Sequence, residues 1–422
     1  MSRFAALIPL HVARTVALHA QRLADPLRQD APPPTRRDIL GVVEQLGAIQ
    51  IDTLQMVQRS HYLTLWSRLG SYDPADVDAL AYGRGADPDD RQLFEYWFHA
   101  ACLIPLSEYR YSLPHKRRNR ERPDSWHSHW LATPEARTVL TYVMTRIKEQ
   151  GAVRAADFEH DGHRGGSWWS WKPAKRALEI LFTEGTLMVA DRVNFQRVYD
   201  LTERVLPDWV DTSEPTLEET RRYLMTRAVR AFGLCEPLQA ANYVHMKRST
   251  ARPHVEALLK AGELLEVNAE LADGRTTTMV LHRDNAPILE AALDGALAAR
   301  RTTFLSPFDS LFWPQGRDRQ LWGFEQTLEA YKPAPQRLWG YFCLPILHGD
   351  RLIGRFDPKL ERRSGTLILR TLYLEPGIEL GDELVADVAA AMRDFLRFHN
   401  ANNLVIERSD PPAFGERLLA AL

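Results

Sequence analysis

The hydrophobic pattern of the chain predicts one local unit more than once: an amphipathic helix, a glycine and a short alternating strand. The clearest copy lies between residues 217 and 282. Its predicted elements are three helices, a strand and a return strand: Arg221–Phe232, Pro237–Val244, Thr250–Ala261, Leu264–Val267 and Thr277–Leu281. Three helices followed by a two-stranded ribbon is the order of a winged helix-turn-helix.

Two further copies are predicted upstream. The second consists of two helices and two wing strands: Glu135–Gln150, Ala174–Glu184, Leu187–Val189 and Phe195–Leu201. The fainter first copy has helices at His11–Ala24 and Arg36–Leu46, with Thr35 as the cap of the latter. Ile49–Asp52 then takes the wing-strand position. Aligned on their glycines, the three copies read LGAIQID, EGTLMVA and AGELLEV.

The last part of the chain has a different pattern, in which short β-like runs alternate with turn signals. The predicted elements are three strands, a helix and a last strand: Leu338–Leu344, Arg351–Phe356, Thr366–Tyr373, Gly381–His399 and Asn402–Ile406. The predicted fold class is therefore α+β, with tandem winged helix-turn-helix units followed by a small, mostly β C-terminal domain. The expected domains are residues 1–134, 135–212, 213–298 and 299–422.

Composition places the chain among ordinary globular proteins, because 45% of its residues are hydrophobic and 26% are charged. Its three cysteines lie far apart, which argues against a disulfide framework or a structural zinc site and suits a reducing cytosol. No run approaches the roughly 20 apolar residues of a membrane helix. We therefore expect a soluble protein with no membrane partner.

Positive charge is clustered although the formal net charge is −2. One basic stretch runs from Arg110 to Arg122, which we expect to be a loop, and others stand at the starts of two predicted recognition helices. Such clusters can contact DNA phosphates, although a solvated surface loop explains the first stretch equally well. The candidate DNA-binding residues are Lys116, Arg117, Arg118, Arg120, Lys172, Lys175, Arg176, Lys247 and Arg248.

A candidate catalytic pair stands in the strand predicted at residues 49–52. Strict alternation turns Ile49 and Ile51 to the core and places Gln50 and Asp52 together on the opposite face. A carboxylate can accept a proton from water or stabilise a cation, and an amide can orient that water. The alternative is the polar outer face of an edge strand. The segment from Arg59 to Arg68 is predicted to be helical, and Arg59, His61 and Arg68 are candidate supporting residues.

The chain resembles the winged-helix DNA glycosylases that unhook interstrand crosslinks, the YcaQ/AlkZ group. The resemblance rests on five blocks that span almost the whole chain in order: LGAIQIDTLQMVQRSHYLTLWSRLGSY, LFEYWFHAACLIPLSEY, GGSWWSWKPAKRALEILFTEGTLMV, FLSPFDSLFW and WGYFCLPILHGDRLIGRFDPKLER. The family has a Gln-x-Gln and a Gln-x-Asp branch. Gln50-Ile51-Asp52 is similar to the second.

The resemblance implies a monofunctional glycosylase that hydrolyses the N-glycosidic bond of N7-alkylated purines and unhooks interstrand crosslinks. We expect its partner to be double-stranded DNA with alkylated or crosslinked purines, and we expect a monomer in the bacterial cytoplasm, at the nucleoid. Asp52 would activate water and stabilise the oxocarbenium-like sugar, while Gln50 would hold the water. We expect no cofactor and no metal.

Two other functions fit a set of winged helices. A transcription regulator would bind DNA as a dimer through paired half-sites, and Gln50 and Asp52 would be dispensable. A scaffold would use the winged units for protein contacts. Base release from DNA that carries N7-methylguanine separates the enzyme from both.

Overall fold

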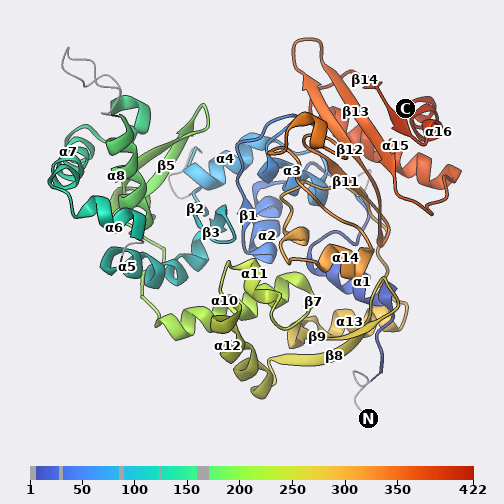
Figure 1. Cartoon of the computed structure of the whole chain (residues 1–422), viewed down its shortest axis with the longest axis horizontal. Helices are drawn as coiled ribbons and strands as arrows, with labels where there is room; N and C mark the ends of the chain where they lie inside the picture. Colours follow the sequence, from blue (N-terminus) through green and yellow to red (C-terminus); the bar gives the residue numbers. More distant parts are fainter. Residues whose placement is uncertain (1–5, 28–31, 85–89, 123–124, 159–170) are drawn as a thin grey trace. The chain divides into compact units, whose positions relative to one another are not determined.

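The computed structural model describes residues 6–27, 32–84, 90–122, 125–158 and 171–422. For residues 125, 126, 171 and 172 only the backbone is described. The chain forms two compact units. The first comprises Met1–Pro74, Phe98–Cys102 and Leu224–Leu422, and the second comprises Ala75–Trp97 and Leu103–Tyr223. Each is a mixture of helices and small sheets (Figure 1).

Three sets of helices, each with three short strands, follow one another along the chain. The first set is α2 (Arg36–Leu46), β1 (Ile49–Gln50), α3 (Ser60–Leu69), α4 (Pro74–Tyr82), β2 (Leu93–Trp97) and β3 (Ala101–Pro105). The second is α7 (Pro134–Gln150), β4 (Val153–Arg154), η4 (Ala155–Phe158), α8 (Trp171–Thr183), β5 (Leu187–Val193) and β6 (Gln196–Leu201). The third is α10 (Leu217–Phe232), β7 (Leu234–Cys235), α11 (Ala240–Tyr243), α12 (Arg248–Lys260), β8 (Leu264–Glu270) and β9 (Thr276–His282).

The three sheets of these sets share one strand order. They run β1-β3-β2, β4-β6-β5 and β7-β9-β8, so the last strand of each set always lies in the middle. The first strand of each set has only two residues and directly follows the first helix. The predicted helices and wing strands of the second and third sets are present with small shifts of their ends.

The predicted alignment of the first set with the others is wrong. Gly47 corresponds to Gly151 and Gly233, which end the first helix of each set with φ of 83°, 86° and 76°. The Gln50 segment is therefore the short strand after the first helix, and the two longer strands of this set are β2 and β3. Glycine ends first and third helices alike, because both need a left-handed residue there. The sequence pattern could not tell which helix Gly47 ends.

The first helix of the chain, α1 (Leu10–Ala20), belongs to none of these sets. It is buried in the core of the first unit, where its apolar residues pack with those of β8 and β9. The Arg14 Nε donates to the carbonyl of Leu321 in α14 (Arg317–Trp322), and the Ile8 N–H donates to Asn268 O in β8. The helix thus joins the third set to the C-terminal part of the unit.

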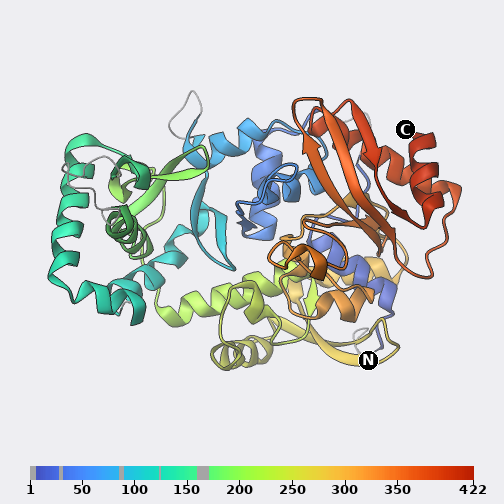
Figure 2. The ribbon, with the colours of Figure 1, turned by 45° about the horizontal axis from the view of Figure 1, so that its top comes forward.

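A six-stranded sheet forms the C-terminal part. Its strands are β10 (Thr302–Phe304), β11 (Leu344–His348), β12 (Arg351–Glu361), β13 (Thr366–Leu374), β14 (Asn403–Ile406) and β15 (Ser409–Asp410). β10 to β13 are antiparallel neighbours, whereas β14 and β15 run parallel to β13. α15 (Asp382–Phe398) packs on β10 and β11, beside the sheet in both ribbon views (Figure 2). The strand predicted at Leu338–Leu344 is wrong, because β11 begins only at Leu344.

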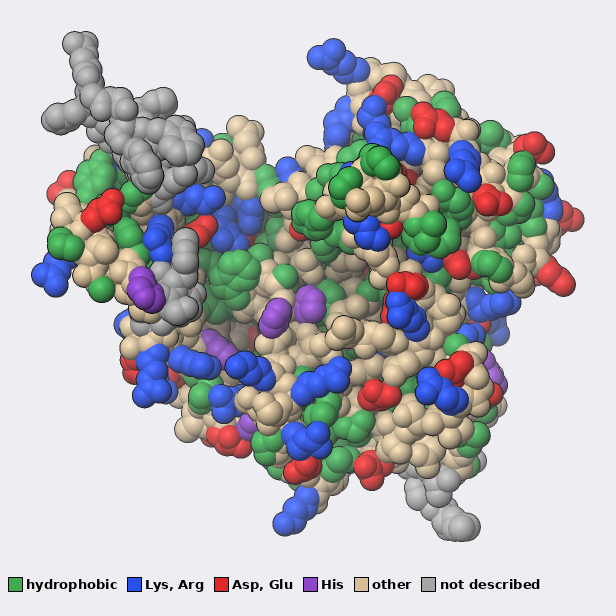
Figure 3. All heavy atoms as spheres, viewed as in Figure 1, with side chains coloured by type: hydrophobic (Ala, Val, Ile, Leu, Met, Phe, Trp, Pro, Cys, Tyr) green, Lys and Arg blue, Asp and Glu red, His purple; other side chains and the backbone are tan. Residues whose placement is uncertain are grey.

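The remaining helices lie between these parts or, in the case of α16, at the end of the chain. They are α5 (Leu113–Glu121), α6 (Ser125–Leu131), α9 (Thr202–Val205), α13 (Ala286–Leu293) and α16 (Pro412–Ala421), with short 3₁₀ segments such as η3 (Leu106–Ser112). The basic stretch predicted to be a loop is thus mostly helix. Lysine and arginine side chains gather on the surface over α11 and α12 (Figure 3). Lys247 and Arg248 at the start of α12 are both exposed.

Candidate active site

The candidate pair Gln50 and Asp52 lies at the end of β1. The side chains alternate in burial as expected: Ile49 is 1% exposed and Ile51 is 7% exposed, whereas Gln50 and Asp52 are half-buried. The regular strand ends at Gln50, two residues before the predicted end. Asp52 therefore stands at the start of a loop, although the alternation of burial continues through it.

A local turn holds the carboxylate of Asp52. Its Oδ1 accepts the N–H of Leu54 at 2.8 Å, an arrangement in which the side chain replaces a backbone turn. Arg59 Nη1 donates to the carbonyl of Thr53 at 2.8 Å and closes the same loop. Burial raises the pKa of Asp52 above its ordinary value, and the N–H groups of Leu54 and Thr53 and the charge of Arg59 only partly oppose this.

The helix before the pair ends in a way that only glycine allows. Gly47 has φ +83°, and a Cβ there would lie 2.8 Å from Arg227 Nε. The guanidinium of Arg227 reaches this point because it donates to the carbonyls of Glu44 and Gln45, the latter at 2.9 Å. The Tyr243 hydroxyl donates to the carbonyl of Leu46. The last carbonyls of α2 are thus capped, which fixes where β1 begins.

The helix after the pair, α3, is tied to it directly. Ser60, its first residue, donates through Oγ to the carbonyl of Gln50 at 2.9 Å. His61 is 4% exposed, and its ring lies 4.0 Å from that of Tyr62. One turn further, Trp66 Nε1 donates to an Asp394 oxygen of α15 at 2.8 Å. Of the predicted supporting residues, the structure brings Arg59 to the loop of Asp52 and buries His61 within α3.

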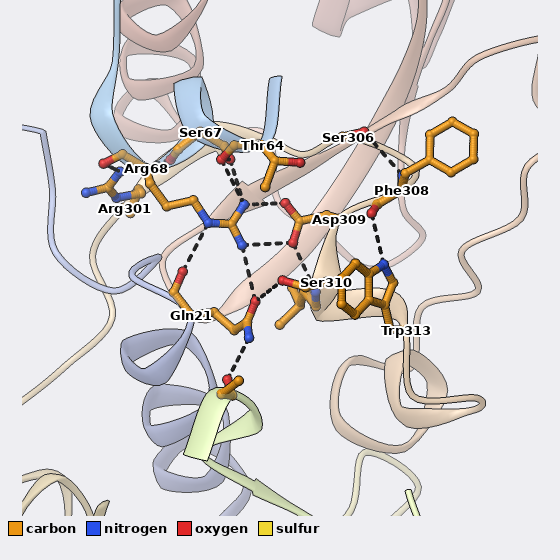
Figure 4. A network of polar contacts seen from close by, with 12 residues as sticks. Gln21, Thr64, Ser67, Arg68, Arg301, Ser306, Phe308, Asp309, Ser310 and Trp313 are labelled. Atoms are coloured by element: carbon orange, nitrogen blue, oxygen red, sulfur yellow. Dashed lines mark hydrogen bonds and ion pairs between the residues drawn. The ribbon is translucent and has the colours of Figure 1, made fainter. Parts of the chain in front are cut away.

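Arg68 has a different place from the one expected. Its guanidinium forms a two-pronged pair with the carboxylate of Asp309, and both side chains are fully buried (Figure 4). Arg68 Nε also donates to the carbonyl of Gln21 at 3.1 Å. Arg301 caps the same helix end, donating to the carbonyls of Ser67 and Arg68 at 2.8 and 2.6 Å. Arg68 therefore anchors the far end of α3 and does not flank the candidate pair.

The loop between β1 and α3 is anchored on the C-terminal sheet. Leu360 in β12 donates its N–H to the carbonyl of Met56 at 2.9 Å. Arg362 Nη2 donates to the carbonyl of Val57 at 2.6 Å. The loop that begins with Asp52 is thus held at both ends and along its middle.

His99 lies in the turn between β2 and β3, close along the chain to a backbone contact of Ile51, and the sequence analysis did not single it out. The N–H of Ile51 donates to the carbonyl of Ala101 at 2.8 Å, two residues after His99. His99 Nδ1 donates to the carbonyl of Asn242 at 2.7 Å, and its ring stacks on Trp313 with 4.5 Å between centroids. Burial lowers the pKa of His99, which favours the neutral ring. Only a known strand pairing could have connected LFEYWFHAAC to Gln50.

Residues 43–398 match the family described as DNA glycosylase AlkZ-like, a range that contains the Gln50–Asp52 pair and its anchors. The chain belongs to the AlkZ-like DNA glycosylase family. This confirms the predictions of a DNA glycosylase and of a role in DNA repair. The fold is similar to that of Streptomyces sahachiroi DNA glycosylase AlkZ, with a TM-score of 0.60 and 16% identity over 96% of this chain and 100% of that chain. At this identity the likeness is one of fold. No helix among the described residues is long and apolar enough to span a membrane.

The predicted DNA-binding residues of this AlkZ-like chain differ in their exposure to solvent. Lys247, Arg248 and Lys175 are exposed. Arg176 is half-buried, with its guanidinium 5.2 Å from the ring centre of Trp130. The side chain of Lys172 lies outside the described part of the chain.

The basic side chains of α5 lie partly on the surface and partly in the core. Arg117, Arg118 and Arg120 are exposed, and Arg117 pairs with Glu214 at 3.2 Å. Lys116 is only 6% exposed. Its ammonium lies 3.9, 4.8 and 5.5 Å from the ring centres of Tyr109, Tyr96 and Phe94, and burial lowers its pKa to about 7. The prediction of Lys116 as a surface cation is wrong, because on this helix its position faces the aromatic core.

Proposed function

We propose that this member of the AlkZ-like family is a monofunctional DNA glycosylase that hydrolyses the N-glycosidic bond of N7-alkylated purines. The observation that carries the proposal is the placement of Gln50 and Asp52. Both side chains are half-buried where β1 ends, whereas Ile49 and Ile51, which alternate with them, are buried. The carboxylate, moreover, is held in a fixed turn.

The chemistry follows from the leaving group. A purine alkylated at N7 is positively charged and departs as a neutral base, so it needs little help from an acid. The sugar that remains is oxocarbenium-like and is stabilised by a nearby carboxylate, which also removes a proton from the attacking water. We assign both roles to Asp52. The amide of Gln50 both donates and accepts hydrogen bonds, so it positions the water.

Hydrolysis is favoured over a Schiff-base mechanism in this proposal. A covalent lyase step needs an amine nucleophile near C1′ of the sugar. No lysine occurs between Gln50 and Trp66. The raised pKa of Asp52 makes its carboxylate a stronger base than an ordinary aspartate, which suits proton removal from water.

The three helix–strand sets are, in our proposal, winged helices that bind double-stranded DNA. The strand order with the last strand in the middle supports this, as does the exposed basic start of α12. In the second unit the exposed cations of α5 and Lys175 of α8 supply phosphate contacts of their own. Lys116 is left out of the interface because it is buried.

We include interstrand crosslinks among the proposed substrates. A base tethered to the opposite strand cannot rotate alone into a tight pocket, as bases do in most glycosylases. Catalytic groups on a strand end that is partly open to solvent would not require that rotation. The half-exposed positions of Gln50 and Asp52 are compatible with such a lesion.

The proposal is tested by the products released from a panel of duplexes that carry N7-methylguanine, a nitrogen-mustard crosslink or no lesion. We expect a free alkylated purine and an unbroken strand with an abasic site, and a separated strand pair from the crosslink. Strand cleavage by the enzyme would contradict the monofunctional mechanism. Tight binding without release of any base would favour the regulator.

A further inference from the structure

A single loop carries the two most exposed large apolar side chains of the described residues. Tyr331 is 78% exposed and Leu338 is 69% exposed, and both lie between α14 and β11. Single exposed apolar residues are common, but two on one loop suggest a contact surface.

A buried carboxylate makes this loop rigid. Glu329 accepts the N–H groups of Leu338, Trp339 and Gly340 at 3.1, 2.7 and 3.3 Å. Glu329 also accepts a hydrogen bond from the ammonium of Lys332 at 2.9 Å, although the Glu329 side chain is only 2% exposed. Burial alone would raise the pKa of Glu329, but these donors outweigh it and lower the pKa to about 2. Tyr331 and Leu338 are therefore held at the two sides of a closed loop.

The charge of the loop suits an anionic partner. Between residues 326 and 341 the only acidic residue is Glu329, which is buried and paired with Lys332, so Arg337 leaves this stretch with one net positive charge. Arg337 Nε donates to the carbonyl of Lys332 at 2.9 Å, so the second cation is also fixed to the tip. Apolar side chains flanked by cations are the usual composition of a wedge that enters between DNA bases.

The loop and the candidate active site are mounted on the same strand. Tyr341 and Phe342, at the end of the loop, donate their N–H groups to the Asp357 carboxylate in β12 at 2.8 and 2.9 Å. Three residues further, Leu360 holds Met56 in the loop that begins with Asp52. Three residues of strand span about 10 Å. The two loops are thus anchored at neighbouring points of β12, so that one duplex can contact both.

We infer that the loop from Tyr331 to Leu338 is a wedge that unstacks the DNA beside the lesion, with the Tyr331 ring and the Leu338 side chain entering the base stack. This rests on the proposed function, because it takes damaged duplex DNA as the partner. The wedge would open the duplex at the sugar that the water activated by Asp52 attacks, and it would leave a tethered base in place.

The test uses a duplex with 2-aminopurine next to 2′-fluorinated N7-methyldeoxyguanosine, whose glycosidic bond resists hydrolysis. Unstacking raises the fluorescence of 2-aminopurine, so the signal reports insertion without chemistry. We expect a rise with the wild-type protein and with Tyr331→Phe, which keeps the ring. Tyr331→Ala combined with Leu338→Ala should abolish the rise and weaken binding about 5- to 150-fold.

Leu419→Ala is the matched control, because Leu419 is 45% exposed on α16 and lies far along the chain from the loop. It should leave fluorescence and affinity unchanged. An undiminished fluorescence rise in the double variant overturns the wedge, even if the wild-type protein releases bases normally. A wild-type protein that unstacks the duplex but never releases a base contradicts the proposed function and leaves the wedge standing.

Discussion

The carboxyl of Asp52 is half-buried, and burial holds its pKa above the ordinary value. The folded protein therefore binds this proton more tightly than the unfolded chain does. By linkage, the contribution of Asp52 to stability decreases as pH rises through these two pKa values. At neutral pH the ionised carboxylate costs folding free energy, which is typical of a residue kept for chemistry and not for packing.

The rate of base release should show this pKa. We expect single-turnover base release to fall on the acid side as Asp52 becomes protonated, with a midpoint above 3.8, the ordinary value. A pH–rate profile measured on N7-methylguanine DNA, with spontaneous loss of the base subtracted, checks it. A profile that stays flat down to pH 4 would mean that Asp52 does not act as a base.

Gly47→Ala tests the close approach of Arg227 at the end of α2. The left-handed conformation alone costs an alanine roughly 1–2 kcal/mol, and the new Cβ would also displace a guanidinium that caps two carbonyls. Gly262→Ala is the matched control, because φ there is +68° and the added Cβ meets nothing within 4 Å. Urea unfolding should show a larger loss for Gly47→Ala. Equal losses would show that Arg227 adds no constraint.

Among the elements, α3 decides the geometry of the candidate site, because it is fixed to Gln50 at one end and to Asp309 at the other. Its span could be predicted from the sequence to within a residue or two, since its apolar pattern is local. The partners of α3 and of the loop before it could not be predicted, because they are distant in the sequence. Asp309 lies 241 residues after Arg68, and Leu360 contacts Met56 from about 300 residues away. The backbone contact that brings Ala101 next to Ile51 is equally non-local.

Predictions from local sequence were also wrong where the same residue type occurs in two different structural settings. The glycine after a helix marks Gly47 and Gly262 alike, although one ends a first helix and the other follows a third. The charge of Lys116 predicted a surface position, but helical spacing turned that residue toward Tyr109 and Tyr96. The alternation of Ile49 to Asp52, by contrast, predicted burial correctly because the strand period depends on no distant contact.

The Arg68–Asp309 pair should be structural and not catalytic. Removing one partner of a buried ion pair leaves an uncompensated charge and typically costs about 3–5 kcal/mol. We expect the free energy of unfolding to fall by that amount in Arg68→Met and in Asp309→Leu. The double variant should lose less than the sum of the two single losses. Chemical denaturation of the three variants measures this. A strictly additive double variant would show that the two groups do not depend on each other.

At the scale of the whole molecule, the chain passes between its two compact units at residues 74/75, 97/98, 102/103 and 223/224. Each unit carries exposed cations of its own, on α12 in the first and on α5 and α8 in the second. Local basic surfaces are therefore present although the net charge is −2, and we expect DNA affinity to depend on salt through them.

Neutralising these cations should flatten the salt dependence of binding. We expect each lost phosphate contact to reduce the slope of log K against log salt by about 0.9. Lys247→Gln with Arg248→Gln tests the first unit, and Arg117→Gln with Arg118→Gln tests the second. Lys116→Met should leave the slope unchanged, because that ammonium is buried among aromatic rings. Titrations at four salt concentrations distinguish the variants, and a flattened slope in Lys116→Met would contradict the structure.

The most direct test of the account is single-turnover base release by Asp52→Asn on N7-methylguanine DNA, with binding measured in parallel. Asparagine keeps the shape of the side chain and can still accept the Leu54 N–H, but it removes the charge and the base. We predict a rate lower by about 10²–10⁴-fold, with DNA affinity unchanged or slightly higher and a smaller loss for Gln50→Ala. A variant that folds, binds DNA and releases the base at nearly the wild-type rate would contradict the central role of Asp52.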